Sequence, residues 1–334
     1  SALTTGDNNT AVGFNAGLLI TTGYANTLMG RLAGDSLTVG YNNVFLGTQA
    51  GSSTTHATAS VMIGQAAGGA NMTATAIGAV GVGAQALNAL TSGVGNVAVG
   101  YQAGDSVTTG GYNTLVGYKA LSSANAAAAS NTVLGYQAML NCSSVTTTSN
   151  IAIGNAAMTG GSGDLTHCIA IGQIALDDTL GNDQTGTIAI GYMALTALTS
   201  GAGNLAVGYK AGAALTTGTK SVALGYESLN AMQEGIGNTA LGYNALKGAN
   251  HANIDNNVAI GANAMDGLGT GDGAASNIAI GVDSLGGALT GDGNVAIGIG
   301  TGLAVTSAAG NVILGANAGD AITTGGRNVV IGNI

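Results

Sequence analysis

The sequence contains no proline and no tryptophan, and only 6% of its 334 residues are charged. Average usage is about 5% proline, or roughly 17 residues here. Its complete absence indicates that nearly every backbone N–H donates to a hydrogen-bonded ladder, which proline cannot join. Without proline, and without a glycine at every third position, a collagen helix is excluded. Disorder is excluded as well, because 46% of the residues are hydrophobic and they recur periodically.

Basic residues and cysteines are also rare, which bears on partners. The six basic residues are scattered and the formal net charge is −9, so we expect no nucleic-acid partner. Cys142 and Cys168 occupy different points of the repeat, so they are predicted to be small buried hydrophobic residues rather than a disulfide framework. The sequence shows neither a signal peptide nor a run of 18 apolar residues, so no membrane insertion is expected.

What the chain does have is a glycine that returns about every 17 residues. We call it the beat glycine, number the other positions of the repeat from it, and call one repeat a rung. Of the eighteen intervals between beats, eleven are 17 residues long and the others are 18 to 20. Such a period predicts a solenoid in which each rung buries its apolar side against its neighbours. The beat glycines are Gly13, Gly30, Gly47, Gly64, Gly83, Gly100, Gly117, Gly135, Gly154, Gly172, Gly191, Gly208, Gly225, Gly242, Gly261, Gly281, Gly298, Gly315 and Gly332.

The residues just before each beat predict a strand. Position −3 is Thr, Val, Ile or Leu and position −1 is Val, Ile, Leu or Met, between turn residues. We therefore expect an all-β chain, a parallel β-solenoid or β-roll of about 19 rungs with a 17-residue repeat. Residues 1–334 are predicted to form a single shaft, uncapped at both ends, as in a segment of a longer fibre or a subunit that stacks end to end.

Both faces of this strand are apolar, which predicts self-association. Positions −3, −1 and +1 share one face, while position −2 and the beat glycine share the other. A strand that is apolar on both faces is buried on both, and a thin solenoid can cover only one. The small residues at −2, such as Ala98 and Ala206, are expected to line a seam around a shared axis in a homotrimer, with a dimer as the alternative.

Three further positions carry structural predictions. Position −4 is Asn in fourteen of nineteen rungs, which predicts a ladder of stacked amides rather than a row of ligand sites. The Thr-Thr-Gly motif near +8, as in Thr21-Thr22-Gly23, is expected to be a turn whose glycine has positive φ and whose hydroxyls bond the local backbone. Position +4 is Gly or Leu/Met, and Gly is expected to make a tight corner where Leu or Met pins a wider loop. The wider loops fall at 121–187 and 246–277 and are our candidates for recognition.

These residues resemble known repeat arrays. The stretches NVAVGYQAGDSVTTGGY (96–112) and NTALGYNAL (238–246) resemble the repeats of phage tail-fibre proteins, which often precede a self-cleaving intramolecular chaperone domain. The Asn-x-Ala-Ile-Gly core is also similar to the head repeats of trimeric autotransporter adhesins, which form trimers of parallel β-rolls. The resemblance implies a trimeric shaft and carries over no catalytic residues.

Several chemical motifs were weighed and none is expected to be a site. Gly81-Val82-Gly83-Ala84-Gln85-Ala86 matches a dinucleotide-binding pattern, but it lies in register with the repeat and no helix is expected after it. The run 160–164 approaches a calcium-binding nonapeptide that does not recur. The remaining candidates are Asp177, Asp178 and Asp183, which could hold one calcium ion, and the isolated His56, His167 and His251. We expect no catalytic, cofactor-binding or metal-binding residue and no cofactor.

The sequence thus favours a non-enzymatic structural fibre. A phage tail fibre or virion appendage shaft that contributes to host attachment is the first expectation, with the virion surface or the extracellular space as its location. Its partners would be further copies of itself and a cell-surface receptor or glycan. A bacterial surface adhesin head and a self-assembling extracellular filament are the alternatives. A threonine-ladder protein that binds ice or a glycan lattice is a lesser one, because the Thr pair is lost at several rungs.

Overall fold

The computed structural model describes residues 5–123, 127–142, 147–161, 163–177, 183–248, 254–268 and 273–333. The chain is an all-β parallel solenoid of about 18 turns with strands spaced about 17 residues apart, and these residues contain no helix. The predicted all-β parallel β-solenoid is confirmed, with about 18 turns where about 19 rungs were expected. The structure has two compact units, Ser1–Cys168 and Ile169–Ile334, and the repeat motif continues unchanged in the sequence at their boundary.

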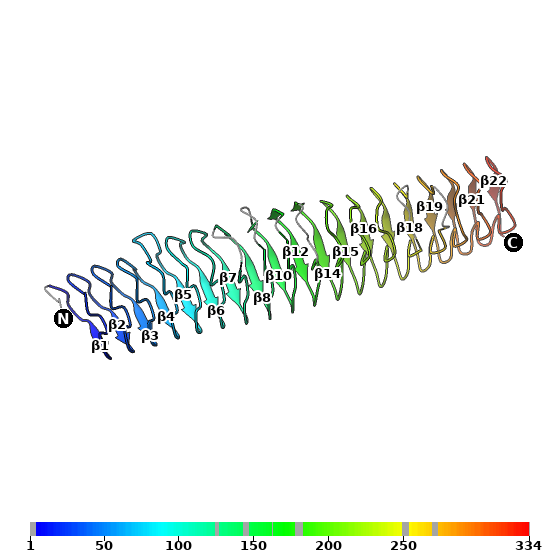
Figure 1. The fold of residues 1–334 in the computed structure, drawn as a ribbon. Coiled ribbons are helices and arrows are strands. Elements are labelled where there is room, and N and C mark those ends of the chain that lie inside the picture. Colours follow the sequence, from blue (N-terminus) through cyan, green and yellow to red (C-terminus); the bar gives the residue numbers. More distant parts are fainter. Residues whose placement is uncertain are drawn as a thin grey trace. The chain divides into compact units, whose positions relative to one another are not determined.

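The first unit stacks short parallel strands, one per rung (Figure 1). Each three-residue strand pairs in register with the next, so that Ala98 lies opposite Leu115. Two shorter strands also pair, Leu165 opposite Thr147. The strands are β1 (Thr10–Val12), β2 (Thr27–Met29), β3 (Val44–Leu46), β4 (Val61–Ile63), β5 (Val80–Val82), β6 (Val97–Val99), β7 (Thr114–Val116), β8 (Thr132–Leu134), β9 (Thr147–Thr148), β10 (Ile151–Ile153) and β11 (Leu165–Thr166).

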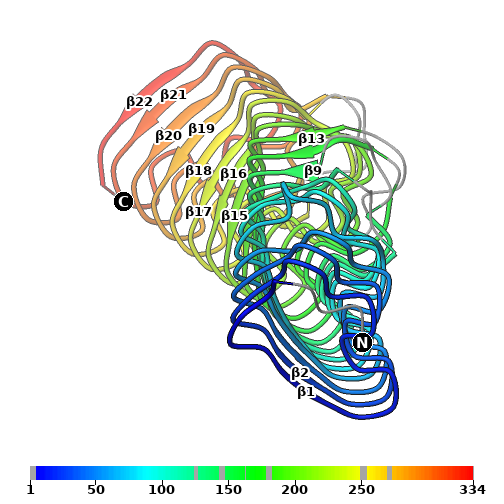
Figure 2. The same cartoon turned by 90° about the vertical axis from the view of Figure 1, so that its left-hand side faces the viewer.

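The second unit repeats this arrangement. Figure 2 shows β15 to β22 following one another along one side of the coil. Ala206 lies opposite Ala223, so equivalent positions of the repeat are aligned in columns. The strands are β12 (Ile169–Ile171), β13 (Gln184–Thr185), β14 (Ile188–Ile190), β15 (Leu205–Val207), β16 (Val222–Leu224), β17 (Thr239–Leu241), β18 (Val258–Ile260), β19 (Ile278–Ile280), β20 (Val295–Ile297), β21 (Val312–Leu314) and β22 (Val329–Ile331).

Backbone hydrogen bonds between rungs continue around the turns, outside the strands. In the rung of Gly208, the N–H of Leu205 donates to Ser221 (2.9 Å) and the N–H of Gly212 donates to Ser228 (2.9 Å). The next beat, Gly225, donates back to Val207 at 2.9 Å. Because such bonds recur at about every second residue, proline at any of these positions would remove a donor. This supplies a physical reason for the absence of proline, with about half of the N–H groups bonded between rungs rather than nearly all of them.

The corners of each rung are left-handed turns. Positions −5, +2 and +4 have φ near +55° in rung after rung, whether or not the residue is glycine. At +4, Gly34 has φ 54° while Leu229 has φ 55°. The prediction that Gly and Leu/Met make different corners is therefore wrong. Left-handed backbone costs non-glycine residues about 1–2 kcal/mol each, which the interior packing of the Leu and Met side chains has to offset.

The strand residue at −2 points into the coil, not toward a neighbouring chain. Ala98 and Ala206 have no exposed surface in the single chain, and the same holds for Leu28, Phe45 and Met62. The predicted seam through −2 is wrong. A coil of 17 residues encloses a narrow interior, which is filled by alanine at −2 and +3 in many rungs and by a larger −2 residue in others.

In the interior, a large side chain at one position of the repeat lies beside a small residue at another. A Cβ added to Gly51 would lie 2.6 Å from Cδ2 of Phe45, and one added to Gly34 would lie 3.1 Å from the same atom. Phe45 at −2 therefore lies beside two glycines at +4, whereas Leu246 and Met265 at +4 fall in rungs whose −2 residue is alanine. The choice of residue at +4 follows the packing of the core.

The asparagines at −4 form the predicted ladder of buried amides. Asn113 donates its Nδ2 to Oδ1 of Asn96 (2.9 Å) and to the carbonyl of Ala128 (2.8 Å). Its own Oδ1 accepts from the N (3.0 Å) and Nδ2 (3.1 Å) of Asn131. Each amide thus satisfies two buried backbone groups that the strand ladder leaves unpaired. The prediction of a structural ladder is confirmed.

The ladder has gaps, and one of them gives a stability prediction. Ser221 occupies position −4 between Asn204 and Asn238; its N–H donates to Oδ1 of Asn204 (3.0 Å), and its Oγ accepts from the N of Asn238 (3.3 Å). Ser221→Asn should restore the missing amide and raise the free energy of unfolding by about 1 kcal/mol. Ser307→Asn, at an exposed position, is the control. Urea denaturation would measure both, and equal stability of the two variants would contradict the argument.

Candidate interaction surface

The outward side of the strands is a continuous apolar face. Positions −3 and −1 point away from the core, and Met29, Leu134 and Leu241 are among the large hydrophobic residues exposed there. No rung has a charged residue at either position. We call the −3 and −1 residues of each unit its outer sheet face. Sequence analysis recognised that both faces are apolar but assigned the wrong one to the inside.

A column of stacked tyrosines borders this face in each unit. Successive rings at +1 are 4.8–5.5 Å apart between centroids and inclined by 10–18°. Within a column, each ring covers the face of the next, so only ring edges and hydroxyls are open. The columns are Tyr101, Tyr118 and Tyr136 in the first unit, and Tyr192, Tyr209, Tyr226 and Tyr243 in the second.

Charged residues lie on the flank beyond the tyrosines. Lys119 and Lys210 at +2 each extend over a tyrosine ring, with Nζ 5.7 Å and 5.4 Å from the centroid. In the second unit, Nζ of Lys247 contacts Oε2 of Glu227 at 2.5 Å. This hydrogen bond raises the pKa of Lys247. The outer sheet face and this charged flank are therefore chemically distinct sides of one rung.

The threonines of the Thr-Thr-Gly motif do not behave as predicted. The hydroxyl of Thr21 donates to the carbonyl of Thr38 at 3.1 Å, and that of Thr38 to Thr55 at 3.1 Å, one rung away rather than locally. The prediction of a positive φ at the motif's glycine is wrong for Gly23. Glycine is required there by space, because a Cβ on Gly23 would lie 2.5 Å from the carbonyl oxygen of Gly40. Because these hydroxyls donate to backbone within the chain, their hydrogens are not available to an external lattice.

The chemical motifs of the sequence lie within ordinary rungs. Gly81 is the inward −2 residue of β5, and the stretch 81–86 leads into a turn. His56 is exposed with Nδ1 2.7 Å from Oγ1 of Thr55, while His167 is a left-handed corner residue. Ser162 of the nonapeptide-like run, Asp178 and His251 lie outside the described residues. Among those described, no three His, Cys, Asp or Glu side chains come close enough to hold a metal ion.

Both cysteines are buried free thiols, as predicted. Cys142 donates its Sγ to the carbonyl of Met158 at 3.2 Å. Burial raises the pKa of Cys142 to about 12, so the unreactive thiol form prevails at neutral pH. Cys142 occupies the +7 core position, which leucine fills in the rungs of Leu37 and Leu90.

The wider loops at 121–187 and 246–277 are only partly within the described residues, so their role in recognition stays a prediction. What sequence analysis missed is a polar cluster of the second unit that flanks and includes part of the second of these stretches. It consists of Glu227, Asn244, Lys247, Asn263, Asp266 and Asp283. The signal was available, because these residues all occupy positions +2 or +5 of successive rungs.

A comparison with protein-family models found no match, and neither did a comparison with curated proteins. In the part of the chain that the structure describes, no helix has the length and hydropathy required to span a membrane. Function therefore has to be argued from the surface itself.

Proposed function

We propose that this protein is a non-enzymatic fibre segment that assembles as a homotrimer through its outer sheet face. Its role would be the shaft of a virion appendage of the phage tail-fibre kind, outside the cell, where it contributes to host attachment. The single observation that supports this most is the partly exposed and uncharged surface formed by positions −3 and −1, which is apolar apart from threonine at −3 in five rungs.

The size of this face supports burial against another chain. The second unit has ten three-residue strands along it. At ~4.8 Å per strand and ~3.3 Å per residue, they cover on the order of 500 Å². Contiguous apolar patches above a few hundred Å² are uncommon on monomers and usually mark interaction sites. A second copy is the partner of choice, because its columns repeat at the same spacing.

A closed ring of three copies needs two different patches on each chain, which meet head to tail. Each unit offers such a pair, namely the outer sheet face and the neighbouring tyrosine column. A two-fold dimer would use one patch twice and would leave the tyrosine hydroxyls outside the interface. This favours the trimer, whose tyrosine edges would cover part of a neighbour's sheet face.

The assembly can be tested by placing charge on the outer sheet face. Leu241→Arg combined with Ile297→Arg changes two residues that are 43% and 40% exposed in the single chain, so the fold should survive. Burying two unpaired charges in an interface should dissociate the trimer. Light scattering should give three times 31.8 kDa for the wild type, and the monomer mass of 31.8 kDa for the variant.

The control is the exposed Thr217→Arg on another side of the rung, which should remain trimeric. A wild-type protein that is monomeric at micromolar concentration would refute the proposal. So would a double variant that keeps its mass.

A further inference from the structure

We propose that the polar cluster of the second unit, together with Tyr243, is a binding site for a neutral saccharide. This inference rests on the proposed attachment role, for which it supplies a ligand class. The cluster comprises Glu227, Asn244, Lys247, Asn263, Asp266 and Asp283, and it concentrates charge in a chain with 6% charged residues.

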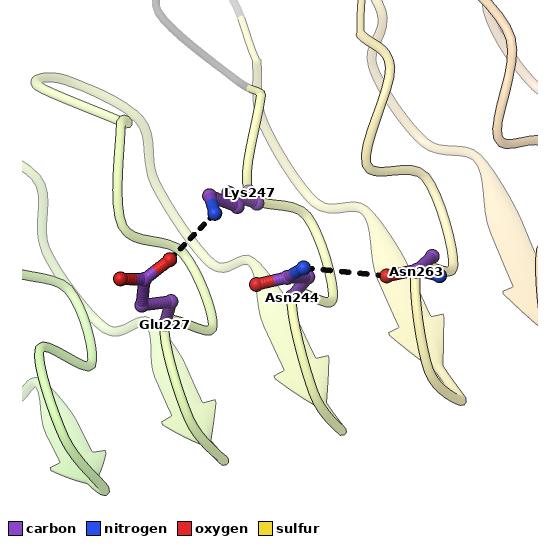
Figure 3. A network of polar contacts seen from close by, with 4 residues as sticks. All are labelled: Glu227, Asn244, Lys247 and Asn263. Carbon is purple, nitrogen blue, oxygen red and sulfur yellow. Dashed lines mark hydrogen bonds and ion pairs between the residues drawn. The ribbon is translucent and has the colours of Figure 1, made fainter.

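The cluster is an organised row that follows the rungs. Nδ2 of Asn263 donates to Oδ1 of Asp283 at 3.1 Å, and Nδ2 of Asn244 lies 3.4 Å from Oδ1 of Asn263. Figure 3 shows these amides beside the Lys247–Glu227 pair. Glu227, Asn244 and Asn263 come from three successive turns, and Lys247 shares the turn of Asn244. The row thus presents donors and acceptors at a repeat of ~4.8 Å.

One side chain of the row, that of Asn244, makes few hydrogen bonds within the chain. Oδ1 of Asn244 has no hydrogen-bond partner, and the bond of its Nδ2 is the long one to Asn263. Asp266 is also in an unfavourable environment, because burial and the neighbouring Asp283 raise the pKa of its carboxyl. A saccharide hydroxyl would donate to the carboxylate of Asp266. It would pair with the amide of Asn244 once this half-buried side chain turns its buried Oδ1 outward.

Tyr243 adds an open aromatic face beside this row. One face of its ring stacks on Tyr226, with centroids 5.5 Å apart, but the next residue in the column is Ala262, which has no ring to cover the other face. Its exposed fraction is 53%, against 46% for Tyr226 and 38% for Tyr209 inside the column. An open ring face is the platform on which the apolar C–H side of a sugar packs.

Together, the polar row and the open ring face of Tyr243 favour one class of ligand. Saccharides present an apolar C–H face and hydroxyls that both donate and accept, which matches one ring face flanked by amides and carboxylates. The cluster holds three carboxylates and one ammonium group, so it disfavours anionic sugars and phosphate groups. The charge on this flank also disfavours its burial against a second copy. In the proposed trimer the tyrosine column meets a neighbour through its ring edges, so the uncovered ring face of Tyr243 at the end of the column stays open beside the polar row.

The test is calorimetric titration of the full chain with maltohexaose, cellohexaose, mannohexaose and chitohexaose. We expect at least one to bind, with affinity falling at least tenfold in Tyr243→Ala and severalfold in Asp266→Asn. The matched control is Tyr136→Ala, which removes the last ring of the other column, itself 49% exposed. The +2 residues beside it are Gln137 and Ala156, where Tyr243 has Asn244 and Asn263. This variant should bind like wild type.

Light scattering of the same samples separates this inference from the proposed assembly. Binding by a wild-type monomer would support the site and refute the trimer, whereas a trimer that binds none of the four sugars would refute only the site. An equal loss in Tyr243→Ala and Tyr136→Ala would also overturn the proposal. Because the side chain of Tyr243 is largely exposed, its removal should leave the melting temperature nearly unchanged.

Discussion

Gly225→Ala should destabilise the protein by about 2–6 kcal/mol. The beat glycine Gly225 has φ 139°, where residues with a side chain are strained by about 1–3 kcal/mol. An added Cβ would also lie 2.7 Å from the carbonyl carbon of Gly242 in the next rung. Relieving that overlap requires separating two rungs, which adds about 1–3 kcal/mol. Urea denaturation would measure the loss.

The matched control is Gly293→Ala. Gly293 has φ 66° and no heavy atom lies within 4 Å of the Cβ it would gain. The chain itself places alanine at the same position, −5, in Ala25 and Ala59, both with φ 53°. We therefore expect a cost of only about 1 kcal/mol. Similar losses in the two variants would show that backbone conformation, not the contact between rungs, selects the beat glycine.

Asn257→Ala should have a comparable effect through a different mechanism. Nδ2 of Asn257 donates to the carbonyl of Ala274 at 2.7 Å, and its Oδ1 accepts from the N–H of Asn277 at 2.9 Å. Alanine would leave both of these buried backbone groups unpaired, at about 1–3 kcal/mol each. We expect a loss of about 2–6 kcal/mol, with faster amide hydrogen exchange at Asn277.

The neighbouring residue provides the control for the amide ladder. Asn256 is exposed and has φ 57°, so Asn256→Ala removes an amide of the same kind that satisfies no buried group. Its cost should not exceed about 1 kcal/mol, from the lower tolerance of alanine for left-handed backbone. Unchanged hydrogen exchange at Asn277 in Asn257→Ala would be incompatible with a ladder that stabilises each rung through the next.

Much of the candidate site was within reach of sequence reasoning. Glu227, Asn244, Asn263 and Asp283 all fall at +2, so a solenoid of constant register necessarily aligns them in one column. Lys247 is different, because its position at +5 does not reveal that its Nζ reaches back one rung to Glu227. The open face of Tyr243 followed from the sequence too, since Ala262 ends the run of tyrosines at +1. Neither the column at +2 nor the end of the tyrosine run could be assigned to a site before the structure showed which positions of the repeat face outward.

The period of the beat glycine was enough to predict a parallel solenoid, its register and the Asn ladder, because a repeat that stacks on itself must place equal positions side by side. The inside and outside of the coil were decided only by the folded chain. Alternation makes −2 and −3 opposite, but both are apolar, so hydrophobicity cannot distinguish them. What selects −2 for the interior is the volume left by the turn residues at +3 and +4, and that volume exists only once the left-handed corners close the rung.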